Sequence, residues 1–309
     1  GNDVIGVTGP PYAWFGIKAR YETLIEGCFV TRCTANGINS AFARNVIIKN
    51  NYVWACHSGI WIDYQTYRSV VTGNICWGNT ASAGIVVANT NGDERYHVIA
   101  NNICYQNDGS YNNKGYGIFL YNARGVIVAN NQIVENGTGS TDGRGLSMDN
   151  VDDTLITGNM IANNNDYGIL GNNLGNVRIF NNSIFNNAGV GQEQIYGWKL
   201  TGTSTGTIEV IDNRFYGLIS SYYSKRSEEI WKRNFGLVTE NSGTSTITAQ
   251  SGSVAHGLAA SGSNVTLTAS GSATNLYMGA LSWYPSGSAG FWIVQTGSGT
   301  VAVNWKAEV

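Results

Sequence analysis

A pattern of short apolar segments recurs along the first two-thirds of the chain. Each copy has an apolar residue three positions before an Asn and another two positions after it, as in NVIIKNNYV (45–53) and HVIANNICY (97–105). The recurring residues are Asn51, Asn74, Asn102, Asn131, Asn159, Asn182 and Asn213, and 23 to 31 residues separate successive members. Self-similarity at this period is typical of a repeat architecture.

A second signature runs in phase with the first. A Gly followed by alternating residues occurs once per copy, as in GIWID (59–63), GIFLY (117–121) and GLSMD (145–149). Each repeat therefore contains two or three short strands joined by turns, and a unit this small cannot bury its own apolar face. Stacking about eight coils buries it, so the pattern predicts an all-β, single-stranded parallel β-helix. A leucine-rich repeat shares the period but requires Leu at fixed positions that hold Ile, Val and Cys here.

The recurring Asn is expected at a tight bend in each coil. Asn tolerates the left-handed backbone that such a bend needs, and stacked Asn side chains can hydrogen-bond from coil to coil. Alternation along the strands then places the apolar residues three before and two after each Asn in the interior. In the second signature, the same alternation points Ile60, Ile85, Ile118, Leu146 and Ile169 inward, and Trp61, Val86, Phe119, Ser147 and Leu170 outward.

The row four positions before each Asn should face outward. It reads Ile47, Val70, Val98, Ile127, Leu155, Arg178 and Glu209. Five outward apolar residues on successive coils form a stripe that monomeric soluble proteins rarely expose. We expect a loop or another subunit to cover it, and favour a cyclic homotrimer.

Composition changes after about residue 217. Residues 222–233 are the most charge-rich run, and Ser, Thr and Gly separate short alternating segments beyond Asn241. We therefore expect a β-helix domain over residues 1–220, a linker over 221–240, and a small antiparallel β-sandwich without catalytic groups over 241–309.

Overall composition removes several classes of protein. A net charge of −2 with 12% charged residues gives no basic surface for nucleic acid, and no apolar run reaches the length of a membrane helix. Apolar residues make up 42% of the chain, which argues against disorder. The three His and five Cys lack metal-ligand spacing, so we expect buried free thiols and no cofactor.

Chemistry on this scaffold must rest on carboxylates, Tyr, Lys or Arg, and two acidic groups of residues are candidates. The first joins Asp63, at the end of its strand, with Asp93 and Glu94 from the loop one coil later. The second is DNVDD (149–153), in which Asp149 ends a strand and Asp152 follows in the turn. Paired carboxylates about 5–9.5 Å apart act as acid and base or nucleophile in glycoside hydrolysis. The alternative is that these Asp residues cap turns through their own backbone.

The alternation places Asp63 and Asp149 on the same face but three coils apart, too far to act as a pair within one chain. Candidate sugar-binding residues lie near them, because sugars stack on aromatic rings and hydrogen-bond to polar groups. These candidates are Trp61, Tyr64, Arg95, Phe119, Tyr121 and Arg144. Packing of the aromatic rings against one another is the structural alternative.

The NN-x-I and G-I-x-h-D/N units over residues 20–217 resemble the right-handed parallel β-helix of pectate-lyase-like proteins. The Ser/Thr/Gly-rich tail resembles the C-terminal modules of phage tailspikes and tail-associated depolymerases. This resemblance implies a homotrimer, extracellular on a virion tail or secreted, that acts on bacterial surface polysaccharide. The chain lacks an NTD…DD arrangement of polygalacturonase type, and DNVDD with Arg144 or Lys199 matches a pectate-lyase site only loosely.

Three functions follow from these observations. The first is a polysaccharide depolymerase that hydrolyses its substrate with paired carboxylates and needs no metal. The second is a lyase or epimerase of the same fold, for which calcium is the expected cofactor. The third is a glycan-binding or structural appendage without catalysis. The residues do not specify the sugar or the linkage.

Overall fold

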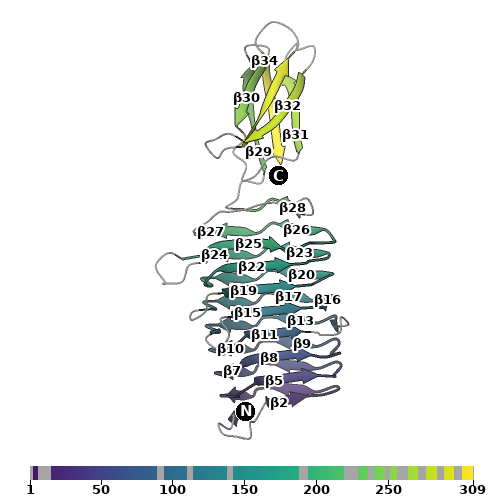
Figure 1. The fold of residues 1–309 in the computed structure, drawn as a ribbon, viewed down its shortest axis with the longest axis vertical. Coiled ribbons are helices and arrows are strands. Elements are labelled where there is room, and N and C mark those ends of the chain that lie inside the picture. The colour runs from purple at the N-terminus through teal and green to yellow at the C-terminus, as the bar shows by residue number, and fades with distance from the viewer. Residues whose placement is uncertain are drawn as a thin grey trace. The chain divides into compact units, whose positions relative to one another are not determined.

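The computed structural model describes residues 3–5, 15–88, 94–109, 114–137, 142–187, 194–218, 229–235, 240–247, 251–255, 264–270, 276–283, 289–295 and 301–308. No α-helix occurs among these residues. The first part of the chain is a stack of coils in which each turn of the chain contributes one strand to each of three parallel sheets (Figure 1). The predicted all-β parallel β-helix is therefore confirmed.

Sheet 1 contains the longest strands of the β-helix, and each of these strands includes a Gly of the second signature. Its eight strands, in spatial order, are β2 (Phe15–Ala19), β5 (Asn36–Ala41), β8 (Ser58–Asp63), β11 (Ala83–Ala88), β15 (Lys114–Tyr121), β19 (Asp142–Asp149), β22 (Tyr167–Asn172) and β25 (Tyr196–Thr201).

Sheet 2 holds the strand that precedes each recurring Asn. Its nine strands are β3 (Leu24–Glu26), β6 (Ile47–Lys49), β9 (Val70–Thr72), β13 (Val98–Ala100), β17 (Ile127–Ala129), β20 (Thr154–Thr157), β23 (Val177–Phe180), β26 (Ile208–Ile211) and β28 (Glu229–Lys232). A two-strand ladder of β12 (Glu94–Arg95) and β16 (Ala123–Arg124) lies in the turns between sheets 1 and 2.

Sheet 3 holds the strand that follows each recurring Asn. Its strands are β1 (Asp3–Ile5), β4 (Phe29–Thr31), β7 (Tyr52–Trp54), β10 (Ile75–Trp77), β14 (Ile103–Tyr105), β18 (Gln132–Val134), β21 (Met160–Ala162), β24 (Ser183–Phe185) and β27 (Arg214–Tyr216).

The core of the β-helix is formed by the predicted inward rows. Ile48, Val71, Ile99, Val128, Ile156, Ile179 and Val210 are fully buried, as are Ile60, Ile85, Ile118, Leu146 and Ile169. Cys76 and Cys104 are direct register partners in sheet 3, and all five cysteines are free. The interior is thus a set of apolar columns, each made of similar residues from successive coils.

The recurring Asn residues form a continuous ladder between sheets 2 and 3. Asn102, for example, donates its backbone N–H (2.9 Å) and its side-chain Nδ2 (3.0 Å) to Oδ1 of Asn131, and Nδ2 also donates to the Val71 carbonyl (2.9 Å). The predicted coil-to-coil bonding is confirmed. The expectation that these Asn residues adopt the left-handed backbone is wrong, because the residue before each of them does so, as at Asn101 (φ 57°) and Asn130 (φ 54°). The bend at the preceding residue turns the carboxamide of the ladder Asn into the core.

A second ladder lies at the turn that follows sheet 3, with its Asn members five residues after those of the first ladder, and the sequence analysis missed it. Its buried members are Asn79, Asn107, Asn136, Asn164 and Gln194. The side-chain amide of each of the four Asn residues donates to the carboxamide oxygen of the next coil, and Gln194 accepts the last of these bonds.

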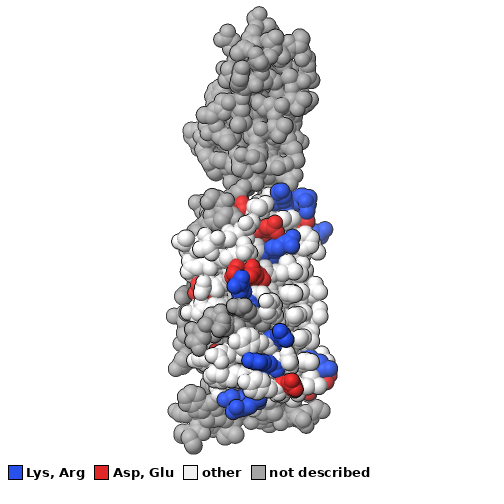
Figure 2. Space-filling model, turned by 90° about the vertical axis from the view of Figure 1, so that its right-hand side faces the viewer, with Lys and Arg blue, Asp and Glu red and all other residues white. Residues whose placement is uncertain are grey.

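The outward rows differ between the sheets. On sheet 2, Ile47 and Ile127 are 41% and 39% exposed, which confirms that this row faces outward. On sheet 1, Val86, Ser147 and Leu170 were expected to be exposed and are buried. Val86 lies in register between Trp61 and Phe119, and these larger rings cover it. Charged side chains are sparse, and on the side of the molecule drawn in Figure 2 Lys and Arg groups are interspersed with Asp and Glu.

The chain divides into two compact units: Gly1–Glu209 with Asn213–Tyr222, and Val210–Asp212 with Tyr223–Val309. The second unit contains two antiparallel three-stranded sheets. One pairs β29 (Glu240–Ile247), β34 (Val301–Glu308) and β31 (Asn264–Ser270), and the other pairs β30 (Ser251–Ala255), β33 (Ala289–Gln295) and β32 (Leu276–Trp283). Packing of these sheets as a sandwich, and the boundaries at 220 and 240, stay predictions.

Candidate functional site

The outer face of sheet 1 carries both predicted acidic positions. Asp63 ends β8 and Asp149 ends β19, and the register runs from Asp63 through Ala88 and Tyr121 to Asp149. The two carboxylates are therefore three coils apart, as expected, and each lines a different hollow.

The first hollow, called here the N-terminal hollow, has a volume of about 580 Å³ and lies against β2, β5 and β8. Lys18, His57, Trp61, Asp63 and Tyr64 contribute its functional groups. Asp63 accepts a hydrogen bond from the Tyr64 backbone N–H (2.9 Å), and burial raises the pKa of its carboxyl. The predicted residues Trp61, Asp63 and Tyr64 are thus brought together here.

The second hollow, called here the central hollow, has a volume of about 320 Å³ and lies against β15, β19, β22 and β25. The polar groups that line it are Tyr116, Asp142, Arg144, Asp149, Asn172 and Thr201, and the apolar ones are Phe119, Met148 and Leu170. Both ends of β19 therefore deliver a carboxylate to one hollow.

Arg144 organises one side of the central hollow. Its guanidinium binds Asp142 through two hydrogen bonds, Nε to Oδ1 at 2.6 Å and Nη2 to Oδ2 at 2.7 Å, and Nη1 donates to the Ser147 hydroxyl at 2.8 Å. The guanidinium also lies 4.8 Å from the centre of the Tyr116 ring, and the Tyr116 hydroxyl donates to Asp142 at 3.0 Å. Burial raises the pKa of Tyr116 well above its ordinary value, so its hydroxyl stays protonated.

Asp149 occupies the other side of the same hollow. Its Oδ1 accepts a hydrogen bond from Asn172 Nδ2 at 2.8 Å, and Asn172 Oδ1 accepts in turn from the Thr201 hydroxyl at 3.2 Å. These three residues end β19, β22 and β25, so the hydrogen bonds run from coil to coil. The neutral partner of Asp149 contrasts with the cationic partner of Asp142.

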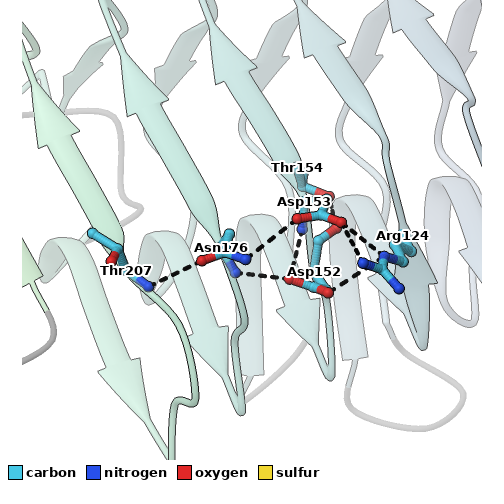
Figure 3. Close-up of polar contacts among 6 residues, drawn as sticks. All are labelled: Arg124, Asp152, Asp153, Thr154, Asn176 and Thr207. Carbon is cyan, nitrogen blue, oxygen red and sulfur yellow. Dashed lines mark hydrogen bonds and ion pairs between the residues drawn. The ribbon is translucent and has the colours of Figure 1, made fainter.

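Asp152 lies in the turn after β19, outside the lining of the central hollow. Figure 3 shows its carboxylate between Arg124 and Asn176. Its Oδ1 accepts from the backbone N–H of Asp153 (2.9 Å) and of Asn176 (2.8 Å), which confirms the turn-capping alternative. Asp153 binds Arg124 at 2.7 Å, and this ion pair lowers the pKa of Asp153. A catalytic role for Asp152 stays a prediction that this geometry does not favour.

The remaining predicted residues fall in other places. Asp93 lies outside the described residues, and Glu94 and Arg95 form strand β12 beside β16. Phe119 lines the central hollow. Tyr121 does not line it, but its ring packs against the Phe119 ring with the ring centres 6.0 Å apart.

The sequence analysis named Arg144 but missed the row of side chains to which it belongs. It runs in register through Ala83, Tyr116, Arg144, Tyr167 and Tyr196, immediately before the Gly-containing part of each sheet 1 strand. Lys199 lies 5.1 Å from the ring centres of both Tyr167 and Tyr196, and its Nζ donates to the Tyr167 hydroxyl at 3.1 Å. The signal available in the sequence was the aromatic or Arg residue at a fixed offset before these Gly residues.

Comparison with known proteins gives the family. The family described as "Right handed beta helix region" matches residues 8–110 and 91–215, which together span about two-thirds of the chain. The chain belongs to this right-handed β-helix family. The coils of Figure 1 correspond to the matched residues.

Three further similarities describe individual proteins. A mannuronan C5-epimerase of Pseudomonas putida is 30% identical over 134 residues, which are 43% of this chain and 22% of the epimerase. The structure of the periplasmic alginate epimerase AlgG is similar with a TM-score of 0.54 and 17% identity, covering 69% of this chain and 50% of that one. The Dettilon tailspike protein matches with a TM-score of 0.41 and 12% identity over 96% of this chain and 81% of its own. The chain thus spans about a fifth of the epimerase matched in sequence and half of the epimerase matched in structure.

The described residues contain no group of three or more His, Cys, Asp and Glu side chains placed to hold a metal ion. They also contain no helix with the length and hydropathy needed to cross a membrane.

Proposed function

We propose that this protein binds a bacterial surface polysaccharide on the outer face of sheet 1 and hydrolyses it at the central hollow. The observation that carries the proposal is that Asp142 and Asp149 line one hollow together with the rings of Tyr116 and Phe119. Two carboxylates that flank the scissile glycosidic bond are the usual arrangement in glycoside hydrolysis.

The surroundings of the two carboxylates suggest different roles for them. Arg144 compensates the charge of Asp142, so we assign Asp142 as the carboxylate that activates water or attacks the anomeric carbon. Asp149 is held by the neutral amide of Asn172, and we assign it as the acid that protonates the glycosidic oxygen. The Tyr116 hydroxyl donates to the same Asp142 oxygen as Arg144 Nη2, and Phe119 offers a ring on which a sugar can stack.

A uronate epimerase or lyase is the second candidate. The 30% identity to a mannuronan C5-epimerase favours it, and Arg144 and Lys199 supply cations near the hollow that can bind a uronate carboxylate. Such an enzyme removes the proton at C5 of the sugar. A lyase of this kind would be expected to need added calcium.

The experiment is incubation of the protein with a panel of acidic and neutral bacterial polysaccharides, with and without a calcium chelator. New reducing ends without ultraviolet absorbance support hydrolysis. An absorbing unsaturated product that disappears with the chelator, or a change in uronate composition without new ends, replaces hydrolysis by the second candidate. A glycan that binds without any product contradicts both enzymatic functions and leaves the binding appendage.

We further propose a homotrimer, either secreted or carried on a virion tail. The support is the outward apolar row of sheet 2, in which Leu24, Ile47 and Ile127 are 54%, 41% and 39% exposed. Light scattering on the purified protein measures the assembly directly. An Ile47→Glu, Ile127→Glu double variant should dissociate a trimer built on this row, and a monomeric wild type contradicts the proposal.

A further inference from the structure

A third hollow lies away from the face of sheet 1, at the turns that lead from sheet 1 to sheet 2. Its volume is about 550 Å³, and none of its lining residues lines the N-terminal or the central hollow. Apart from Asn45, its lining side chains are aromatic or charged: Tyr21, Glu22, Arg44, Tyr67, Arg68 and Tyr96. We call it the corner hollow.

Neighbouring coils supply these residues in register. The backbone N–H of Glu22 donates to the Arg44 carbonyl (2.8 Å), and the N–H of Asn45 donates to the Tyr67 carbonyl (3.0 Å). Arg44 and Tyr67 form a parallel bridge, and the Arg44 guanidinium lies 5.5 Å from the centre of the Tyr67 ring. Aromatic rings and cations therefore follow one another along the helix axis at the spacing of the coils, about 4.8 Å.

The backbone of this corner is unfavourable for the side chains that it carries. Glu22, Arg68 and Tyr96 have φ angles of 53°, 53° and 65°, in the left-handed region where Gly is favoured. Gly125 takes the equivalent position one coil after Tyr96, with φ 69°. Bulky residues held in this region cost of order 1 kcal/mol each, and the same conformation recurs at other turns of the β-helix, as at Arg32 and Phe42. Arg68 and Tyr96 thus occupy positions at which Gly would be the more stable choice.

The charge of the corner changes along the axis. Arg44 and Arg68 are exposed, and Glu22 is the acidic residue among those lining the hollow. One coil after Tyr96, Arg124 is bound by Asp152 and Asp153 (Figure 3), so its charge is already compensated. Lys and Arg groups lie at several levels along the side drawn in Figure 2.

We propose that the corner hollow is a second, non-catalytic binding site for an acidic polysaccharide, separate from the face of sheet 1. The planar guanidinium groups of Arg44 and Arg68 can form paired hydrogen bonds with carboxylate or sulfate oxygens, and the Tyr rings offer apolar faces with a polar edge for the sugar rings. A linear glycan lying along the axis can meet one such residue per coil.

The test measures binding of size-defined alginate at low salt by calorimetry, in an Arg144→Gln background that weakens the central hollow. Arg44→Ala, Arg68→Gly and Tyr96→Gly should each weaken binding about tenfold, a typical loss for one charge-assisted or aromatic contact. Arg178→Ala removes an equal charge from β23, where Arg178 pairs with Glu209, and should change binding less than twofold. Neutral dextran should not bind.

Thermal unfolding separates a binding role from a structural one. Because Gly adopts a positive φ without steric strain, Arg68→Gly and Tyr96→Gly should unfold at the same temperature as the parent or higher. The proposal is overturned if these variants bind alginate like the parent, or if Arg178→Ala weakens binding equally. A 20-nucleotide single-stranded DNA that binds as tightly as alginate also overturns it, because the corner would then be a general polyanion surface. None of these outcomes depends on turnover of the glycan.

Discussion

Asp149 and Asp152 are three residues apart in the chain but perform separate tasks in the fold. Asp149 ends β19 and lines the central hollow, whereas Asp152 holds the backbone of the next coil through the Asn176 N–H at 2.8 Å. Asp149 can therefore contact a substrate, whereas Asp152 stabilises the turn.

This separation predicts opposite results for two substitutions. Asp149→Asn should lower turnover by about 100-fold or more with little effect on stability, because it removes a proton donor and keeps the hydrogen bonding to Asn172. Asp152→Ala should leave turnover within about threefold and lower the free energy of unfolding by about 1 kcal/mol, because two backbone N–H groups lose their acceptor. Steady-state rates and urea unfolding of both variants provide the measurements. Equal loss of turnover in both would return Asp152 to the active site.

Arg144 should be required for binding as well as for turnover. Arg144→Gln removes both hydrogen bonds to Asp142 and the cation above Tyr116, so KM should rise and kcat should fall, with a combined loss of at least about 100-fold. Arg178→Gln is the matched control, because its partner Glu209 lies on sheet 2. Unchanged kinetics in Arg144→Gln would contradict the assignment of the central hollow.

The Asn ladder should dominate the stability of single coils. Asn131→Ala removes the oxygen that accepts from the Asn102 N–H and Nδ2, and it removes the donor to the Ile99 carbonyl. We expect a loss of about 3 kcal/mol, because several fully buried polar groups lose their partners. Asn130 is exposed and has a positive φ, so Asn130→Gly should change stability by less than about 0.5 kcal/mol. Urea unfolding followed by circular dichroism compares the two, and a similar loss in both would argue against the ladder.

Acid should destabilise the protein through His97. This residue is fully buried, its Nδ1 accepts from the Ser69 N–H at 3.3 Å, and burial lowers its pKa to about 4. The unfolded chain binds a proton near pH 6.5 and the folded chain does not, so stability falls as pH decreases from about 6.5 to about 4. The loss specific to His97 should reach roughly 3 kcal/mol at the low end.

His97→Gln keeps an acceptor for Ser69 and cannot titrate. Its free energy of unfolding should therefore depend less on pH than that of the wild type over the same window, measured by urea unfolding at several pH values. Parallel pH curves for the two proteins would show that His97 is not the group responsible.

The repeat made the fold predictable, because period and alternation alone place Ile48, Ile60 and Val53 in the core. What the pattern could not give was the effect of neighbouring coils on each other. Val86 lies on the outer face as predicted, yet it is buried because Trp61 and Phe119 lie beside it in register. Side-chain size across coils decided its exposure.

The candidate site was also predictable only in part, because contacts between neighbouring coils are not visible in the sequence. Strand ends were predictable, so Asp63 and Asp149 were found, together with the three coils that separate them. The hydrogen-bond partners of the carboxylates could not be predicted. Arg144 binds Asp142 within the same strand, whereas Asn172 binds Asp149 from the next strand of sheet 1. The left-handed bend was expected one residue too late, because the sequence does not show which Asn of a pair points into the core.

The two amide ladders have a consequence for how such a protein changes length. Each interior Asn rung accepts from the coil before it and donates to the coil after it, so these Asn residues present the same acceptor and donor. Duplication or deletion of one whole repeat leaves each remaining rung with an equivalent partner. The length of the β-helix can therefore change in whole coils without redesign of its interior.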